Sequence, residues 1–282
     1  MAVLTGTQIA QFHDLGYVLI ERALPASDLQ PLIHEFEEAV DRTARRCFEA
    51  GTLRALYADA SFERRLALLA GATDDLSPIL TAFEGKAHKT AGMFALMTHP
   101  VLLDIVEGLI GPEILAHPQF NVRAKLPGDP YRVVPWHQDL AYLEPEAADT
   151  RMVNFWIPFI DAPMETGALQ VIPGSHRWGL IPHESLNPTY IGVADASLPP
   201  HEVVGCPLPL GGVLIMQHRL MHRSIENTTP FVRWSADIRC SDPAQPTGRP
   251  SVPGFLARSV SRPGAVAHSY HDWLALFEPA SA

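Results

Sequence analysis

The chain has 282 residues, of which 47% are hydrophobic and 18% charged, the balance of an ordinary soluble globular protein with a sizeable core. Its 21 basic and 31 acidic side chains give a net charge of −10, which argues against nucleic acid and anionic membranes as partners. Cys47, Cys206 and Cys240 lie far apart and form no CxxC pair, so we expect free thiols in a reducing, cytoplasmic compartment. We expect no basic leader and no apolar run long enough to span a bilayer.

The first part of the chain is predicted to be mainly helical. A short helix should end near Gly16, and the apolar run at 17–20 predicts a strand. Apolar residues at helical spacing predict a longer helix from 25 to about 46. Residues 60–110 continue in a helical pattern, which Gly111-Pro112 closes.

After Gly111-Pro112 the pattern changes to short β-like runs broken by proline and glycine. The runs are 119–126, 152–160, 168–172, 212–216 and 234–239. Short strands with regular turn signals predict a sandwich or barrel rather than βαβ units. Because no linker is visible, we expect a single domain over 1–282. It would have a helical part at about 1–112, a β core at about 113–240 and a C-terminal extension at 241–282.

The segment Val134–Tyr142 contains His137 and Asp139, two residues apart. On a strand these side chains would project from the same face, while Gln138 would turn away. One imidazole and one carboxylate supply two legs of the 2-His-1-carboxylate triad that holds non-haem iron. His-x-Asp arises by chance in many chains, so the interpretation needs a second histidine.

Two candidate histidines, His218 and His222, follow the apolar run that begins at Gly211-Gly212. On a helix they would share one face, as in zinc proteases. However, no glutamate follows His218, and the glycine pair with β-branched residues argues against a helix. A strand favours His222 as the metal ligand and His218 as a near neighbour.

Arg233 follows His222 by eleven residues (233 − 222 = 11) and enters an apolar strand candidate. Its planar guanidinium can bind a carboxylate through two parallel hydrogen bonds, and the Ser224 hydroxyl could assist. The alternative is an ion pair with an acid such as Asp237. Three further cations, Arg123, Lys125 and Arg132, precede the site; they either meet an anionic substrate group or form a solvated face.

These segments together resemble the phytanoyl-CoA dioxygenase family of iron(II)- and 2-oxoglutarate-dependent oxygenases. The resemblance rests on Trp136–Asp139, on His222-x-Ser224-x-x-Asn227 and on Arg233. The opening Phe12–Val18 and the turn Gly167–His176 are also similar to the family. The likeness runs from about residue 7 to residue 239.

The resemblance implies a mainly β fold with flanking helices, a double-stranded β-helix or jelly roll. It implies that His137, Asp139 and His222 hold Fe(II), and that Arg233 and Ser224 take the distal carboxylate of 2-oxoglutarate. Gln119, Asn121 and Trp156 would lie around the metal or the co-substrate; packing within the core is the alternative for these three.

The implied enzyme consumes 2-oxoglutarate and O2, releases succinate and CO2, and hydroxylates an unactivated C–H bond of a small molecule. Asp139 favours hydroxylation over halogenation in such a site. We expect a natural product or another small polar substrate, with an acyl-CoA thioester as the alternative within the family. Two rivals are a cupin-like metal protein that does not use 2-oxoglutarate, in which Arg233 would have no role, and an inactive ligand-binding jelly roll. The oligomeric state is not predicted.

Overall fold

The computed structural model describes residues 4–85, 88–186 and 189–278. Its helices lie mostly before residue 111, as predicted. They are α1 Gly6–Leu15, α2 Ala26–Glu49, α3 Phe62–Ala70, α4 Ser77–Leu80, α5 Ala91–Met97, α6 Pro100–Ile110 and, near the C-terminus, α7 Tyr270–Ala275. Thr5 begins α1 with a capping box, in which its hydroxyl accepts from the Gln8 backbone N–H and the Gln8 side chain accepts from the Thr5 backbone N–H.

The strands form one large sheet, one small sheet and a short hairpin. They are β1 Tyr17–Ile20, β2 Ile114–Ala116, β3 Asn121–Lys125, β4 Met152–Pro158, β5 Leu169–Val171, β6 Glu184–Ser185, β7 Ile191–Gly192, β8 Val204–Cys206, β9 Val213–Gln217, β10 His222–Ser224, β11 Arg233–Ser241 and β12 Phe255–Arg258. The large sheet runs β1-β9-β4-β11-β2-β12, with β3 also paired to β11, and the small sheet runs β10-β5-β8. All these pairs are antiparallel.

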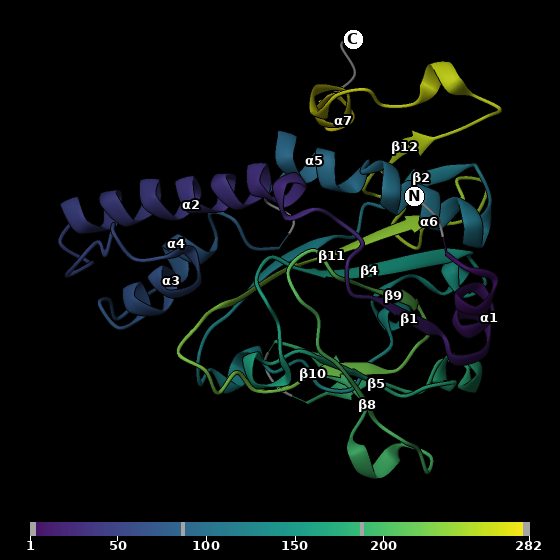
Figure 1. The fold of residues 1–282 in the computed structure, drawn as a ribbon, viewed down its shortest axis with the longest axis horizontal. Coiled ribbons are helices and arrows are strands. Elements are labelled where there is room, and N and C mark those ends of the chain that lie inside the picture. The colour runs from purple at the N-terminus through teal and green to yellow at the C-terminus, as the bar shows by residue number, and fades with distance from the viewer. Residues whose placement is uncertain (1–3, 86–87, 187–188, 279–282) are drawn as a thin grey trace.

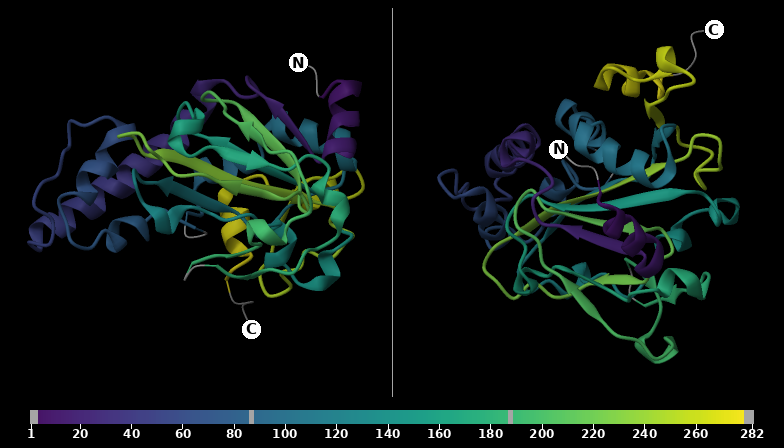
Figure 2. Two further views of the ribbon diagram at one scale, coloured as in Figure 1. Left: turned by 90° about the horizontal axis from the view of Figure 1, so that it is seen from below. Right: turned by 45° about the vertical axis from the view of Figure 1, so that its right-hand side comes forward.

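The two sheets face each other, and helices cover the other side of the large sheet. Figures 1 and 2 show α2, α5 and α6 on the side of the large sheet away from β5, β8 and β10. The predicted mainly β jelly roll with flanking helices is therefore confirmed. β1 from the N-terminal part and β12 from the C-terminal extension both join the large sheet.

Side-chain alternation explains why the large sheet has one apolar and one partly polar face. On β4, Val153, Phe155 and Ile157 belong to the core beneath the helices, whereas Trp156 belongs to the cluster between the sheets. The helix-side core includes Phe36 of α2, whose ring lies 5.6 Å from that of Trp234 and parallel to it within 13°. Burial of such aromatic surface fixes the helical layer on the sheet.

Residues 91–110 are together apolar and long enough to cross a membrane by composition. The structure divides this segment at Thr98 and His99, and His99 caps α6 by accepting a hydrogen bond from the Val101 N–H over 3.2 Å. Apolar residues of both helices, including Met93 and Val106, are buried in the core with the large sheet. Packing onto the sheet therefore accounts for the apolar character of this segment.

Candidate active site

The His137–Asp139 segment is not the strand that its sequence predicts. His137 forms one isolated bridge with His222, and Asp139 begins a 3-10 helix over Asp139–Tyr142. The bridge exchanges backbone hydrogen bonds of 2.9 and 3.0 Å between the two histidines. Asp139 is therefore brought to its position by a turn and not by strand alternation. The buried Gln138 side chain does point elsewhere, donating to the carbonyl oxygens of Gly179 and Arg219.

His137, Asp139 and His222 come together as the sequence predicted. One ligand atom from each lies within 4.8 Å of the others, and all three residues are buried. The two imidazole centroids are 4.1 Å apart, and His137 Nε2 lies 3.9 Å from Asp139 Oδ1. His218 is not part of this group, because its Nε2 faces the Ala148 carbonyl oxygen at 3.1 Å.

Backbone carbonyl groups fix the tautomers of both histidines. His137 Nδ1 lies 2.9 Å from the Pro135 oxygen, and His222 Nδ1 lies 3.0 Å from the Leu220 oxygen. Since a carbonyl can only accept, each Nδ1 must carry the proton, and each Nε2 then presents a lone pair. Burial, aided by the neighbouring His222, lowers the pKa of His137 to about 3, which keeps its imidazole neutral.

Two side chains hold the Asp139 carboxylate. Arg239 Nη2 donates to Oδ1 and Asn154 Nδ2 donates to Oδ2, each over 2.5 Å. Burial alone would raise the pKa of Asp139, but the charge of Arg239 and the nearby histidines hold it far below its usual range. The carboxylate is therefore ionised, oriented and able to bind a cation.

Arg233 is buried at the start of β11 and forms no ion pair in the described part of the chain. Its Nη1 donates to Ser235 Oγ over 2.6 Å, and its Nε has no hydrogen-bond partner among the described residues. Asp237, the alternative partner, instead accepts from Arg123 Nε over 2.8 Å. Burial lowers the pKa of Arg233 to about 10, so the group is still charged at neutral pH. A buried guanidinium without an acid is a site for an anion.

The remaining predicted residues line one cavity of about 840 Å³ together with the histidines, Asp139 and Arg233. Ser224, Gln119, Asn121 and Trp156 are all among its walls. The Trp156 ring lies 5.3 Å from the Arg233 guanidinium, and the Trp156 indole N–H has no partner among the described residues. Gln119 lies two residues before β3 begins at Asn121, so the strand predicted from residue 119 starts two residues too early.

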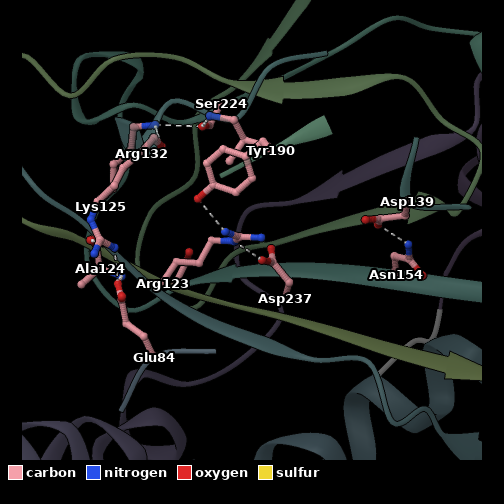
Figure 3. A network of polar contacts seen from close by, with 12 residues as sticks. Glu84, Arg123, Ala124, Lys125, Arg132, Asp139, Asn154, Tyr190, Ser224 and Asp237 are labelled. Atoms are coloured by element: carbon pink, nitrogen blue, oxygen red, sulfur yellow. Dashed lines mark hydrogen bonds and ion pairs between the residues drawn. The ribbon is translucent and has the colours of Figure 1, made fainter. Parts of the chain in front are cut away.

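The sequence did not single out two of the residues at the centre of the site. Asn154 and Arg239, which hold Asp139, come from β4 and β11. The available signal was alternation: Arg233, Asp237 and Arg239 are spaced by even numbers on an apolar strand and so share a face. Of the three uncertain cations, Lys125 is buried, whereas Arg123 and Arg132 are partly exposed and paired with acids (Figure 3).

The donor set suits the metal and co-substrate that the resemblance implies. Two imidazole Nε2 atoms and one carboxylate form a three-ligand face, and such a face leaves positions open on a six-coordinate iron. The buried Arg233 offers a separate anion site in the same cavity. Fold and site together define the jelly-roll class of non-haem iron oxygenases.

Comparisons with known proteins agree with this class. The family model described as phytanoyl-CoA dioxygenase (PhyH) matches residues 12–235, and the chain belongs to that family of iron(II)- and 2-oxoglutarate-dependent oxygenases, which use O2. The predicted family and enzyme class are confirmed.

Named relatives and a solved structure extend the comparison. The chain is 27% identical over 263 residues to phytanoyl-CoA dioxygenase domain-containing protein 1 of Danio rerio, covering 83% of this chain and 88% of that protein. It is 28% identical over 160 residues to 1-deoxypentalenic acid 11-beta-hydroxylase of Streptomyces arenae, covering 51% and 55%. The epimerase SnoN, solved with Fe3+, alpha-ketoglutarate and nogalamycin RO, has a similar fold, with a TM-score of 0.55, 21% identity and 86% of each chain covered.

Proposed function

We propose that this protein is an iron(II)- and 2-oxoglutarate-dependent hydroxylase that acts on a small polar molecule. When bound, the iron with 2-oxoglutarate and O2 supplies an oxidant strong enough to hydroxylate an unactivated C–H bond, with release of succinate and CO2. The single domain over 1–282 belongs to the same proposal. It is supported by one continuous core that includes residues of α2, α5, α6, the large sheet and Trp273 of α7.

In this proposal His137 and His222 bind iron through Nε2, and Asp139 binds it through its carboxylate. The carbonyl groups that accept from both Nδ1 atoms orient the rings and maintain the tautomer that a metal requires. Arg239 and Asn154 orient Asp139 in the same way. Each ligand is thus oriented by hydrogen bonds within the protein.

Arg233 carries the assignment of 2-oxoglutarate. It is 2% exposed, lines the cavity that holds the triad, and has no acid partner in the described part of the chain. The distal carboxylate of a dicarboxylate co-substrate would complete its hydrogen bonding, and Ser224 lines the same cavity. Gln119, Asn121 and Trp156 are positioned to contact the co-substrate or substrate.

The polar cavity wall supports a small polar substrate over an acyl chain. Arg123 donates to Asp237 over 2.8 Å and to the Tyr190 hydroxyl over 3.2 Å (Figure 3). Tyr142 also lines the cavity. A hydrocarbon tail would remove the ion pair of Arg123 with Asp237 from water without offering it any polar contact in exchange. The natural-product hydroxylase among the relatives is consistent with a small substrate.

Anaerobic titration of the protein with Fe(II) and 2-oxoglutarate tests the reaction class. A bidentate keto-acid chelate of Fe(II) has a weak visible charge-transfer band. We expect this band in the wild type, no band in His222→Ala, and a band in Arg233→Ala that needs roughly 100-fold more 2-oxoglutarate, because a charge-assisted bidentate contact is lost. Arg258→Met is the matched control, since its ion pairs with Asp104 and Glu107 lie outside the cavity.

Two results would contradict the proposal. If the wild type showed no band at any concentration, the oxygenase assignment would fail and an inactive binding protein would fit better. If metal bound but Arg233→Ala behaved as the wild type, a cupin-like metal protein without 2-oxoglutarate would be favoured. A cytoplasmic location and the exclusion of nucleic acid and membrane partners stay predictions from the sequence.

A further inference from the structure

Lys125 is an unusual lysine for its surroundings. The chain contains only three lysines among its 21 basic residues, and Lys125 is 2% exposed at the end of β3. It forms no ion pair in the described part of the chain; its Nζ donates to the Arg132 carbonyl oxygen over 2.9 Å and to Ser224 Oγ over 2.8 Å. Lysine is almost never fully buried unless it is paired. Its position therefore requires an explanation beyond packing.

The second observation is a like charge beside it. Lys125 and Arg233 are direct partners in the β3–β11 register, and both line the cavity of the metal triad. Like charges directly opposite each other destabilise a sheet, and burial increases the cost. Two adjacent buried basic side chains, neither with an acid partner in the described residues, are explained if an anion binds beside them in the cavity.

The hydrogen bonds of the Ser224 hydroxyl show how Lys125 would act. A hydroxyl can accept two hydrogen bonds and donate one. Ser224 Oγ accepts from Lys125 Nζ over 2.8 Å and from the Val134 N–H over 3.0 Å, which uses both lone pairs (Figure 3). Its proton is then left for an acceptor in the cavity that Ser224 lines.

The backbone around the lysine stem keeps this arrangement rigid. Gly167 has a φ of +82°, and a Cβ there would lie 2.6 Å from Lys125 Cε and 2.7 Å from the Ile225 carbonyl oxygen. Only glycine suits this conformation and leaves room for the stem. The stem of Lys125 therefore packs directly against the Gly167 backbone.

We propose that Lys125 is a positioning residue of the co-substrate site, which orients the Ser224 hydroxyl toward the distal carboxylate of 2-oxoglutarate and adds a second positive charge beside Arg233. This inference rests on the proposed function. The carboxylate would then accept two hydrogen bonds from the Arg233 guanidinium and one from the Ser224 hydroxyl. Lys125 would donate to the oxygen of that hydroxyl.

The test is Lys125→Met, which keeps the length of the stem and removes the ammonium. We expect the Kd of 2-oxoglutarate in the anaerobic Fe(II) titration, and its KM, to rise about 10- to 100-fold, because a charge-assisted contact is lost. The affinity for Fe(II) alone and kcat at saturating 2-oxoglutarate should stay within about two-fold. Arg258→Met should lose stability without changing either constant.

A double-mutant cycle with Ser224→Ala separates positioning from general destabilisation. If Lys125 acts through Ser224, removal of the serine hydroxyl should cost little more in the Lys125→Met background. Penalties that simply add would overturn the positioning role. Lys125→Gln, which can still donate to Ser224, serves if Lys125→Met does not fold; it should lie between the wild type and Ser224→Ala in affinity for 2-oxoglutarate.

The outcomes distinguish this inference from the proposed function. A wild-type band with unchanged 2-oxoglutarate affinity in both Lys125 variants would overturn the role of Lys125 and leave the hydroxylase assignment standing. The lack of a band in the wild type would overturn the hydroxylase assignment first.

Discussion

At the scale of single residues, the site depends on groups that hold the ligands in place. Asp139 is ionised in a buried position because Arg239 and Asn154 each donate to one of its oxygens. The two histidines present Nε2 because carbonyl groups occupy both Nδ1 protons. Such contacts commonly change metal affinity by about 10- to 100-fold when they are removed.

Arg239→Met should therefore weaken Fe(II) binding by about 10- to 100-fold. The variant leaves the buried Asp139 with Asn154 as its one strong donor, so its pKa should rise and its charge should be less well oriented. Anaerobic Fe(II) titration, with far-ultraviolet circular dichroism to check folding, measures the effect. A folded variant with wild-type iron affinity would show that Arg239 is not needed to hold Asp139.

Binding of 2-oxoglutarate should weaken as the pH rises above about 6. The pKa of Lys125 is lowered to about 6, mainly by burial. The charges of Arg233, Arg123 and Arg132 lower it as well, and the charge of Asp129 opposes them. A bound carboxylate favours the charged lysine, so the pKa is higher in the complex than in the free protein. The Kd should accordingly be constant below pH 6 and then rise by up to about tenfold per pH unit, until the pKa of the complex is reached.

Anaerobic titrations between pH 5.5 and 8.5 would measure this dependence. The pKa of His137 is about 3, so its imidazole does not titrate in that window. Lys125→Arg is the control, because its guanidinium stays charged and should remove the slope. An equal slope in wild type and Lys125→Arg would assign the titration to another group.

At the scale of elements, the alternation of side chains along each strand gives the two faces of the large sheet different functions. On β11, Trp234, Ala236 and Ile238 pack beneath the helices, whereas Arg233 and Asp237 face the cavity. In this sheet β3, β4, β9 and β11 thus contribute both to the core and to the walls of the cavity. The helices stabilise the outer face and contribute few residues to the cavity.

Phe36→Ala should reduce the free energy of unfolding by about 3–5 kcal/mol, the usual cost of truncating a buried phenylalanine. Phe36 of α2 is fully buried, and its ring lies 5.5 to 6.3 Å from those of Phe159, Trp234 and Phe83. Phe48→Ala on the same helix is the control, since Phe48 is 46% exposed and should change stability by at most about 0.5 kcal/mol. Denaturant unfolding measures the free energy of unfolding of both variants. Equal decreases in the two variants would mean that α2 is not held by this aromatic cluster.

At the scale of the whole molecule, the site lies between two sheets, and ligands should therefore stabilise the entire fold. His137 and His222 come from different parts of the chain, and Arg233 lies on the opposite sheet from β10. A metal and an anion bound there connect the two sheets. Ligands that bind only the folded state stabilise it by mass action.

Mn(II) with 2-oxoglutarate, each at about 100 times its Kd, should raise the melting temperature by roughly 10 °C. Saturation to this extent contributes about 2.7 kcal/mol per independent site, and 1 kcal/mol shifts the midpoint by roughly 2–4 °C in a protein of this size range. Differential scanning fluorimetry measures the shift, and His222→Ala should show much less of it. A wild-type midpoint that does not respond would contradict ligand binding between the sheets.

The sequence by itself determined the family, the fold class, and the convergence of His137, Asp139 and His222 with Arg233 in one cavity. The family could be predicted from local motifs and the β fold from short strands with regular turn signals, and the resemblance to that family implied the convergence of the four residues. The sequence predicted a strand at Asp139, however, and a turn is present, since a backbone that pairs at only one bridge leaves no periodic signal.

Only the tertiary structure decided which groups support the site. Asn154 and Arg239 meet Asp139 from two other strands, and Lys125 reaches Ser224 across 99 positions of sequence. The sequence favoured a solvated face for the same lysine over contact with an anion, because the charge of a residue does not reveal whether its strand face is covered. Burial and the identity of a hydrogen-bond partner are properties of packed surfaces, and they exist only once the two sheets and the helical layer have come together.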